Sequence, residues 1–408
     1  MSAPAEAPQA PPPPVPPVPR RDRRAWWDTA LLNVLSVLLA LVVGGVLIAV
    51  SDEDVRAAAS YFFARPADTL VAVAGAVGDA YAALFRGAVL DTRADDLAGA
   101  LQPLADTLLF ATPLIAGGLA VALPFRAGMF NIGAEGQITV AAIGAAWVGF
   151  AADLPPVVHL VAAVLAGLVA GAVWGGIPGL LKAATGAHEV ITTIMLNYVA
   201  RFGLLFLLGT AAFQRPGRAD PISPPIDPGA VLPVIVPGSR LNVGLLLAVG
   251  AAVLTWWLLS RSTMGFRFRA VGANSEAART AGISVPRVYV LVMLVAGGLA
   301  GIAGVSQVLG SERVLTQGVS AGLGFDAITV ALLGRANPWG VLGAGVLFGA
   351  LNAGGITMQA QTGTSLDIVT VIQALIVLFI AAPVLVRAVF RLRSAGGGIG
   401  QLSKGWNG

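Results

Sequence analysis

Gly265–Arg287 reads GFRFRAVGANSEAARTAGISVPR and separates two of the longest apolar runs in the chain, Leu241–Leu259 and Val288–Leu309. Each run has about the length of a helix that crosses the ~30 Å hydrocarbon core of a bilayer. The segment between them is basic, and arginines next to membrane spans collect on the cytoplasmic side. The quoted segment therefore predicts a polytopic helical membrane protein with this loop in the cytoplasm.

The composition of the whole chain supports a membrane protein. Of its 408 residues 56% are hydrophobic and only 11% are charged, whereas about 25% of a soluble domain is charged. The net charge of +4 comes from arginines beside apolar runs, so it indicates membrane topology rather than nucleic-acid binding. With no cysteine and only two histidines, His159 and His188, no metal site is expected.

Differences in composition along the chain predict three parts. Residues 1–27 are Pro-rich and are expected to form an extended cytoplasmic tail. Residues 28–389 are expected to form the transmembrane domain, in which 52–100 is an external loop with interfacial pieces and 260–287 is the cytoplasmic loop quoted above. Residues 390–408 are expected to form a second cytoplasmic tail.

The apolar runs predict an all-α protein with about ten transmembrane helices and both termini in the cytoplasm. The run at 30–50 is too long for the apolar region of a cleaved signal peptide, so it is counted as the first span. Asp68–Leu90 is expected at the membrane interface, and the alternative, a further full span, would invert the topology of everything after it. The other nine spans are expected at Leu104–Pro124, Gln137–Ala151, Val157–Leu181, Val190–Leu208, Leu241–Leu259, Val288–Leu309, Phe325–Gly334, Gly340–Ile356 and Ile368–Val389.

Two short segments on these spans resemble each other. Gly136–Gly144 reads GQITVAAIG and Asp326–Gly334 reads DAITVALLG, and each precedes an apolar run rich in Gly and Ala. They lie on the third and eighth predicted spans, which cross the membrane in opposite directions. The pair predicts two inverted halves of five helices, an arrangement found in many transporter cores.

Polar side chains inside predicted spans are costly and often mark a substrate path. Most of them fall in three segments interrupted by Gly or Pro, namely 130–137 (FNIGAEGQ), 188–198 (HEVITTIMLNY) and 324–340 (GFDAITVALLGRANPWG), whereas Gln307, Asn352 and Gln373 are solitary. The alternative is that they only cap helices, where a carboxylate in the first turn is favourable, or hydrogen-bond between helices. The candidate path residues are Asn131, Glu135, Gln137, Glu189, Asn197, Asp326 and Asn352.

The second half of the quoted loop is expected to form a short helix. Asn274 or Ser275 suits its N-cap, Glu276 lies in its first turn, and Gly282 suits its end. A helix whose exposed face is mostly alanine is suited to a groove on another protein, although the arginines alone would suffice for a plain cytoplasmic loop. The docking residues are expected to be Arg267, Arg269, Gly272, Asn274, Glu276, Ala277, Ala278, Ala281 and Gly282.

GFRFRAVGANSEAARTAGI resembles the cytoplasmic coupling loop of permease subunits in ATP-binding-cassette (ABC) importers of the ribose and branched-chain amino acid permease superfamily. FRAGMFNIGAEGQ, HEVITTIMLNYVA and GFDAITVALLGRANPWG are similar to the signatures of its nucleoside and simple-sugar branch. The resemblance runs from about Leu101 to Arg387 with the motifs in the same order. Asn131 and Glu135 match the branch, whereas the residue before Glu-Val differs from the usual pattern, so His188 inherits no role.

The resemblance implies a transport subunit, not an enzyme, in a bacterial cell membrane. Its implied partners are a second permease subunit, homologous or identical, an ABC ATPase subunit, an extracellular substrate-binding lipoprotein and the lipid bilayer, with no nucleic acid. No cofactor is expected in this chain, and ATP and magnesium are expected on the ATPase. The residues agree, because neither Lys182 nor Lys404 follows a glycine as a Walker sequence requires.

The cargo implied by the resemblance is a nucleoside, and a simple sugar is the alternative. A different class of transporter also remains open from the residues alone. In a proton-coupled secondary transporter, the carboxylates of Glu135, Glu189 or Asp326 would carry protons, but that class gives no reason for an Ala-rich cytoplasmic helix.

Overall fold

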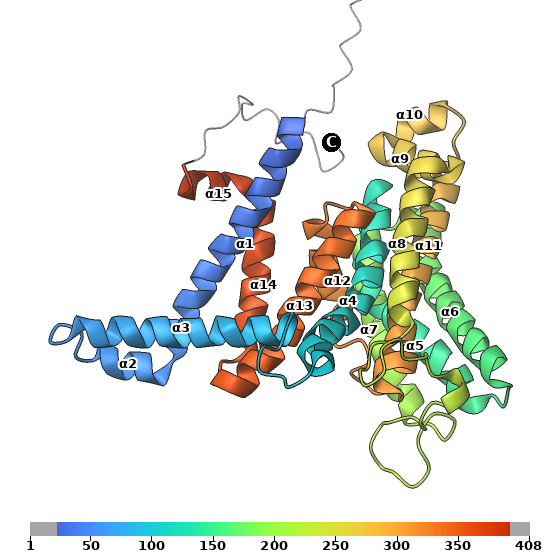
Figure 1. The fold of residues 1–408 in the computed structure, drawn as a ribbon. Coiled ribbons are helices and arrows are strands. Elements are labelled where there is room, and N and C mark those ends of the chain that lie inside the picture. The colour runs from blue at the N-terminus through green and yellow to red at the C-terminus, as the bar shows by residue number, and fades with distance from the viewer. Residues whose placement is uncertain (1–22, 392–408) are drawn as a thin grey trace, which may run out of the picture.

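The computed structural model describes residues 23–391, so the predicted tails at 1–27 and 390–408 fall mostly outside the described residues. Helices dominate the described part of the chain (Figure 1). Their bounds are α1 (Arg23–Ser51), α2 (Glu53–Ala59), α3 (Pro66–Ala88), α4 (Leu97–Arg126), α5 (Ala134–Ala151), α6 (Pro156–Thr185), α7 (Glu189–Leu208), η1 (Pro228–Ala230), α8 (Gly244–Arg261), α9 (Thr263–Ala273), α10 (Ser275–Thr280), α11 (Val285–Val305), η2 (Ser306–Glu312), α12 (Leu323–Leu333), α13 (Pro338–Thr362), α14 (Leu366–Ala381) and α15 (Pro383–Val389).

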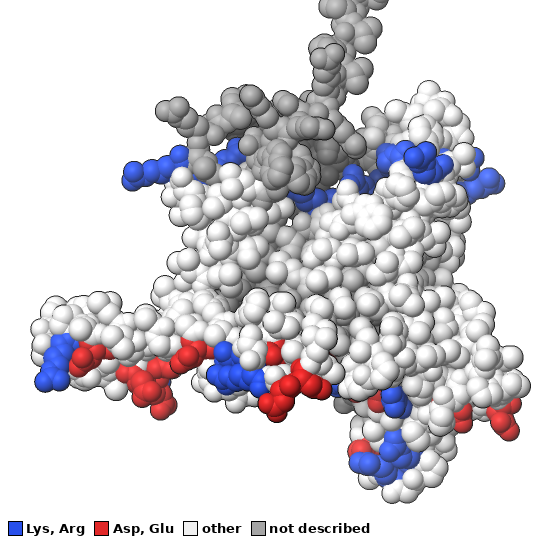
Figure 2. All heavy atoms as spheres, viewed as in Figure 1, with Lys and Arg blue, Asp and Glu red and all other residues white. Residues whose placement is uncertain are grey.

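The long helices run roughly along one axis, with α9 and α10 at one end and α2 and α3 at the other (Figure 1). We call these the α9–α10 end and the α2–α3 end. Figure 2 shows that the acidic residues on the visible face lie at the α2–α3 end, together with some arginines, whereas the charges visible at the α9–α10 end are Lys and Arg. This asymmetry is the one that the positive-inside rule gives when the α9–α10 end is cytoplasmic.

Between residues 23 and 391, eight helices are long and apolar enough to cross a membrane, or nine if α14 and α15 count as one bent span. The fold class is therefore as predicted, but ten full spans are not observed. One reason is α12, which forms the predicted eighth span with only 11 residues. At 1.5 Å per residue it is about 17 Å long, too short to cross a bilayer alone.

The last predicted span, Ile368–Val389, is wrong as a continuous helix. It breaks at Ala382 into α14 and α15, which meet at 93°. Pro383 causes the break, because proline has no N–H to donate and disfavours helical geometry in the residue before it. Ala382 accordingly has φ −116° and ψ 65°.

Helix α3 contains most of Asp68–Leu90, the segment expected at the membrane interface, with a further full span as the alternative. Its length and composition would allow it to span a membrane. Figure 1 instead shows α3 lying across the direction of α1 and α4, the orientation of a helix in the plane of the interface. This orientation favours the interfacial interpretation, and the topology that follows from it stays a prediction.

The packing of the core supports the two inverted halves. Helix α4 packs against α12 and α13, and α11 packs in the same way against α5 and α6. α4 runs toward the α9–α10 end and α11 runs away from it (Figure 1). The helices α4, α5 and α6 therefore correspond to α11, α12 and α13. The corresponding helices make the same contacts but run in opposite directions, as the two similar segments predicted.

Glycines permit the closest helix crossings of both halves. A Cβ on Gly171 of α6 would lie 2.5 Å from the carbonyl oxygen of Gly297 of α11. A Cβ on Gly349 of α13 would likewise lie 2.5 Å from the carbonyl oxygen of Thr107 of α4. The Gly-rich sequences of α6 and α13 therefore serve close packing, as small residues do in membrane helices generally.

Candidate functional site

Helices α5 and α12 both begin inside the helix bundle. After α4 ends at Arg126 the chain turns back, and Asn131 Nδ2 donates to the carbonyl oxygen of Ala120 (3.1 Å). Ala120 lies six residues before the end of α4, about 9 Å into the bundle at 1.5 Å per residue. Near the start of α12, the Ala327 side chain packs against Gly117, where a Cβ would lie only 2.9 Å from that of Ala327. Asn131 therefore precedes α5 at a point inside the bundle, where it is fully buried.

The first turns of α5 and α12 meet head to head. The backbone of Gly324 packs directly against that of Glu135, with no room for a Cβ. The Glu135 carboxylate accepts hydrogen bonds from the backbone N–H groups of Gly322 (Oε1, 3.1 Å) and Gly324 (Oε2, 2.7 Å). Glu135 thus caps a helix of the opposite half of the chain while lying in the first turn of its own helix, where both partly positive N-termini stabilise its charge. The Asp326 carboxyl group is close enough to interact electrostatically with Glu135.

Three buried amide side chains hold the start of α5 in place. Asn131 and Gln137 exchange two hydrogen bonds, of 3.0 and 3.1 Å. Asn197 of α7 accepts from the backbone N–H of Gly136 (2.8 Å) and donates to the carbonyl oxygen of Ile132 (2.9 Å). Because these amides already bond to the protein, they position the segment, whereas the half-buried Glu135 and Asp326 carboxylates remain partly accessible.

Glu189 contacts the segment before α5, whereas Asn352 bonds to a different helix. The buried Glu189 carboxylate pairs with Lys182 Nζ of α6 (2.5 Å) and lies beside the backbone of Phe130. Asn352 of α13 instead accepts a hydrogen bond from Gln373 of α14 (2.9 Å), a partner that sequence reasoning did not connect with it. Among the described residues, no group of three or more His, Cys, Asp or Glu side chains is arranged to hold a metal ion.

The loop quoted at the outset folds into two helices. The Asn274 side chain accepts from the backbone N–H groups of Glu276 and Ala277 (both 3.0 Å), so the predicted N-cap of α10 is confirmed at Asn274. Gly282, at φ +81°, follows the helix end and supplies a left-handed conformation that glycine adopts without strain. Helix α9 was not predicted, although Ser262, which caps it by accepting from Gly265 N–H (2.9 Å), is a recognisable start.

Burial divides the expected docking residues of α9 and α10 into two groups. Ala278 is only 4% exposed and packs inside this protein, and Gly272 is half-buried. Phe266, 60% exposed, adds a large apolar side chain that sequence reasoning missed. The exposed members of the expected set are Arg267, Arg269, Asn274, Glu276, Ala277, Ala281 and Gly282.

A direct backbone contact joins this loop to the start of α5. A Cβ on Gly272 of α9 would overlap the carbonyl oxygen of Arg126 and lie 2.9 Å from the backbone N of Gly128. Gly128, at φ +71°, begins the turn that leads back to Asn131. Arg126 also donates from Nε to the carbonyl oxygen of Ala336 (2.9 Å), in the turn after α12. The loop therefore contacts the segment before α5, which is linked through Arg126 to the end of α12.

Two inverted halves, with a helix from each beginning inside the bundle, are the arrangement of many membrane transporters. The chain belongs to the family described as branched-chain amino acid transport system / permease component, which matches residues 104–381, more than half of the chain.

Several ABC transporter permeases are similar to this chain. A guanosine ABC transporter permease of Bacillus subtilis is 38% identical over 315 residues, which cover 77% of this chain and 88% of the relative. A glucose ABC transporter permease of Haloferax volcanii is 36% identical over 360 residues, 85% and 86% of the two chains. A nucleoside ABC transporter permease of Lactococcus lactis is 36% identical over 293 residues, 69% and 80%. No solved structure matches the chain. The resemblance to the nucleoside and simple-sugar permeases is thus confirmed.

Proposed function

We propose that this chain is the permease subunit of an ATP-driven importer of nucleosides, and that the cargo passes the junction of α5 and α12. The observation that carries the proposal is the junction itself. Helices from both halves begin there, and Glu135 of one half bonds the backbone of the other. In transporters built from inverted repeats, substrate sites lie where such interrupted helices meet. A rocking motion of one half against the other would open the junction first to one side and then to the other.

The exposed surface of α9 and α10 is proposed to dock a separate ABC ATPase subunit that carries ATP and magnesium. Family membership and the basic charge of this end support a cytoplasmic position for it. Phe266 and the exposed alanines Ala277 and Ala281 would enter the groove of the ATPase, and Gly272 would pass its movement to the α4–α5 turn. A second permease subunit and an extracellular substrate-binding lipoprotein complete the proposed assembly, in a bacterial cell membrane with both termini in the cytoplasm.

The choice of a nucleoside rests on the relatives. Guanosine and nucleoside permeases, 38% and 36% identical, support it. The glucose permease, 36% identical over 85% of this chain, favours a sugar as the second candidate. The junction suits the feature that both cargoes share, because sugar hydroxyl groups donate hydrogen bonds to carboxylates such as Glu135 and Asp326 and accept them from backbone N–H groups.

A proton-coupled secondary transporter is less consistent with these observations. Family membership favours an ATP-driven permease. Two of the three carboxylates are also already bonded, Glu189 to Lys182 and Glu135 to two backbone N–H groups. Both carboxylates are thus accounted for by contacts that hold helices together.

Uptake by proteoliposomes that contain the chain with its ATPase and binding protein tests the proposal. Radiolabelled guanosine should accumulate only with ATP, and a protonophore should leave its uptake unchanged. A matched assay with glucose distinguishes the second candidate. Uptake that continues without the ATPase and collapses with the protonophore would show that the chain is a secondary transporter.

A further inference from the structure

An apolar groove of about 680 Å³ lies between α1, α2 and α3. Val42 and Val46 of α1 form one wall, and Val77 and Tyr81 of α3 form the other. The hydroxyl group of Tyr81 is already bonded, because it donates to the carbonyl oxygen of Leu41. The groove lies in the part of the chain before residue 104, where the family match begins, so membership of that family assigns nothing to it.

The groove lies on an exposed apolar stripe of α1. Leu38, Val42, Val46 and Val50, four residues apart, lie on one face of this spanning helix and are 49 to 65% exposed. Val34, one turn before Leu38, continues the same stripe outside the groove and is 56% exposed. Hydrocarbon is the natural occupant of an apolar groove on such a stripe, because an apolar site offers water no hydrogen-bond partners.

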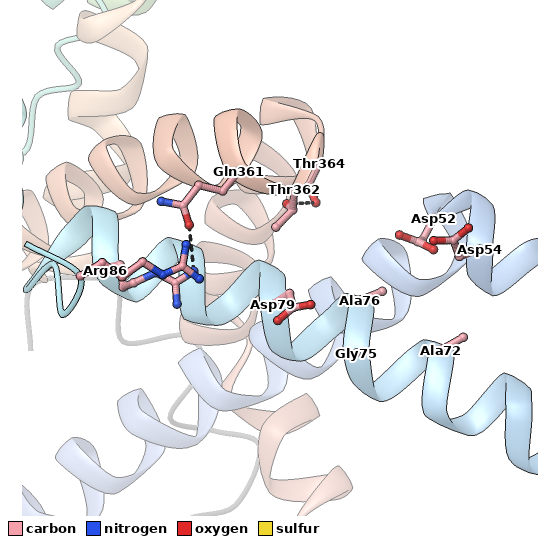
Figure 3. A pocket seen from close by; sticks show the side chains of 11 residues that line it. Asp52, Asp54, Ala72, Gly75, Ala76, Asp79, Arg86, Gln361, Thr362 and Thr364 are labelled. Carbon is pink, nitrogen blue, oxygen red and sulfur yellow. Dashed lines mark hydrogen bonds between the residues drawn. The ribbon is translucent and has the colours of Figure 1, made fainter.

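Helix α3 separates this groove from a polar cleft on its other side. Figure 3 shows that cleft, which Asp79 and Arg86 of α3 line together with Asp52 and Asp54; Arg86 lies at its other end and donates to Gln361 (2.8 Å). An amphipathic helix with an apolar side toward one groove and charges toward another lies at the level of the lipid headgroups. The apolar groove is therefore at the depth where acyl chains begin.

Arg56 of α2 lines the groove and is its only charged lining residue. Its side chain is 61% exposed, and its polar contacts are long: the carbonyl oxygens of Ser51 and Asp52 at 3.3 Å and a Glu53 carboxylate oxygen at 4.0 Å. Such contacts are weaker than good hydrogen bonds of about 2.7–3.2 Å. The guanidinium group is thus available for a phosphate, which it binds through two parallel hydrogen bonds.

We propose that this groove binds one phospholipid of the leaflet at the α2–α3 end, with an acyl chain between α1 and α3 and the headgroup phosphate on Arg56. The charge distribution favours a lipid over a helix of a second permease subunit. An apolar helix pressed into the groove would take the Arg56 charge out of water with only the Glu53 carboxylate, 4.0 Å away, to balance it, and this would carry a desolvation cost. A phospholipid supplies both the chain and the anion. The groove prefers anionic headgroups, such as phosphatidylglycerol, to zwitterionic ones.

Native mass spectrometry of the full-length chain in detergent, titrated with phosphatidylglycerol or phosphatidylcholine, tests the site. Val46→Trp fills the groove, and Val34→Trp is its control on the same stripe. Arg56→Gln removes the headgroup contact, and Arg65→Gln, at an exposed arginine just before α3, controls for lost positive charge. Size-exclusion profiles confirm that each variant is folded and report its assembly with a second subunit.

The unmodified chain and both controls should retain one phosphatidylglycerol that Val46→Trp loses. Arg56→Gln should reduce the preference for phosphatidylglycerol about fivefold, the Boltzmann factor for the roughly 1 kcal/mol of one arginine near an anionic membrane surface. Equal retention by Val46→Trp and Val34→Trp would overturn the proposal, as would equal preference in Arg56→Gln and Arg65→Gln. Loss of subunit assembly in Val46→Trp with unchanged lipid retention would assign the groove to a protein partner instead.

Discussion

Gly272→Ala is the substitution that most directly probes the link between the α9–α10 loop and the junction. The added methyl group would overlap the carbonyl oxygen of Arg126 and lie 2.9 Å from the backbone N of Gly128. Backbone atoms on both sides prevent the relief that a flexible side chain would give. To restore ordinary van der Waals separation, α9 must move roughly 1 Å away from the α4–α5 turn. Overpacking of this kind costs about 1–3 kcal/mol.

Gly272→Ala should therefore impair the transfer of movement rather than the docking of the ATPase. The exposed residues Phe266, Ala277 and Ala281 are unchanged, so the ATPase should still co-purify. A coupling energy of about 1–3 kcal/mol corresponds to a 5- to 150-fold change. We therefore expect the rate of nucleoside uptake to decrease by a factor in that range. Uptake and ATP hydrolysis are measured in the same proteoliposomes.

Gly250→Ala is the matched control, because a Cβ at this position of α8 meets no atom within 4 Å. It should transport like the unmodified chain. If Gly272→Ala retains the uptake of Gly250→Ala, the contact between α9 and the α4–α5 turn carries no movement and the reasoning is refuted.

Three further predictions concern the junction, the loop and a buried ion pair. Glu135→Gln keeps the shape but removes the charge facing two helix N-termini, so it should lower the free energy of unfolding by about 1–2 kcal/mol in thermal denaturation; an unchanged melting temperature would contradict this. Ala278→Glu should reduce the amount of folded protein because Ala278 is buried, whereas Ala277→Glu should leave that amount unchanged and abolish ATPase co-purification; identical behaviour of the two would be inconsistent with the docking surface. Lys182→Met leaves Glu189 buried without its partner and should destabilise the protein by about 3 kcal/mol, and adding Glu189→Gln should restore most of the loss; an additive double variant would refute the coupling.

Features with a local chemical cause were predictable from the sequence. The apolar runs give the helical membrane fold because an isolated span must satisfy its own backbone hydrogen bonds. Asn274 and Gly282 bracket α10 because capping depends on neighbouring residues. The break at Pro383 was equally visible in the sequence and could have divided the last predicted span.

Features that depend on depth and on distant partners were not predictable. The start of α5 has the same local pattern at a membrane surface as inside a bundle, so 130–137 does not reveal that the chain turns back beside α4. The Glu135 carboxylate accepts a hydrogen bond from Gly322, 187 residues away in the chain. A single sequence contains no information on which distant residues lie close together. Ala278 was expected on the docking surface, because a helix of six residues is too short for its buried face to be read from periodicity.

The central claim is that the cargo passes the junction of α5 and α12, and thiol labelling at the junction tests it most directly. The chain has no cysteine, so Asp326→Cys supplies a single thiol, and Asn352→Cys is a control away from the Glu135 group. In the assembled transporter, guanosine should slow labelling of Asp326→Cys, and adding ATP should change its rate, while Asn352→Cys responds to neither. Labelling of Asp326→Cys that is indifferent to both guanosine and ATP would contradict the account.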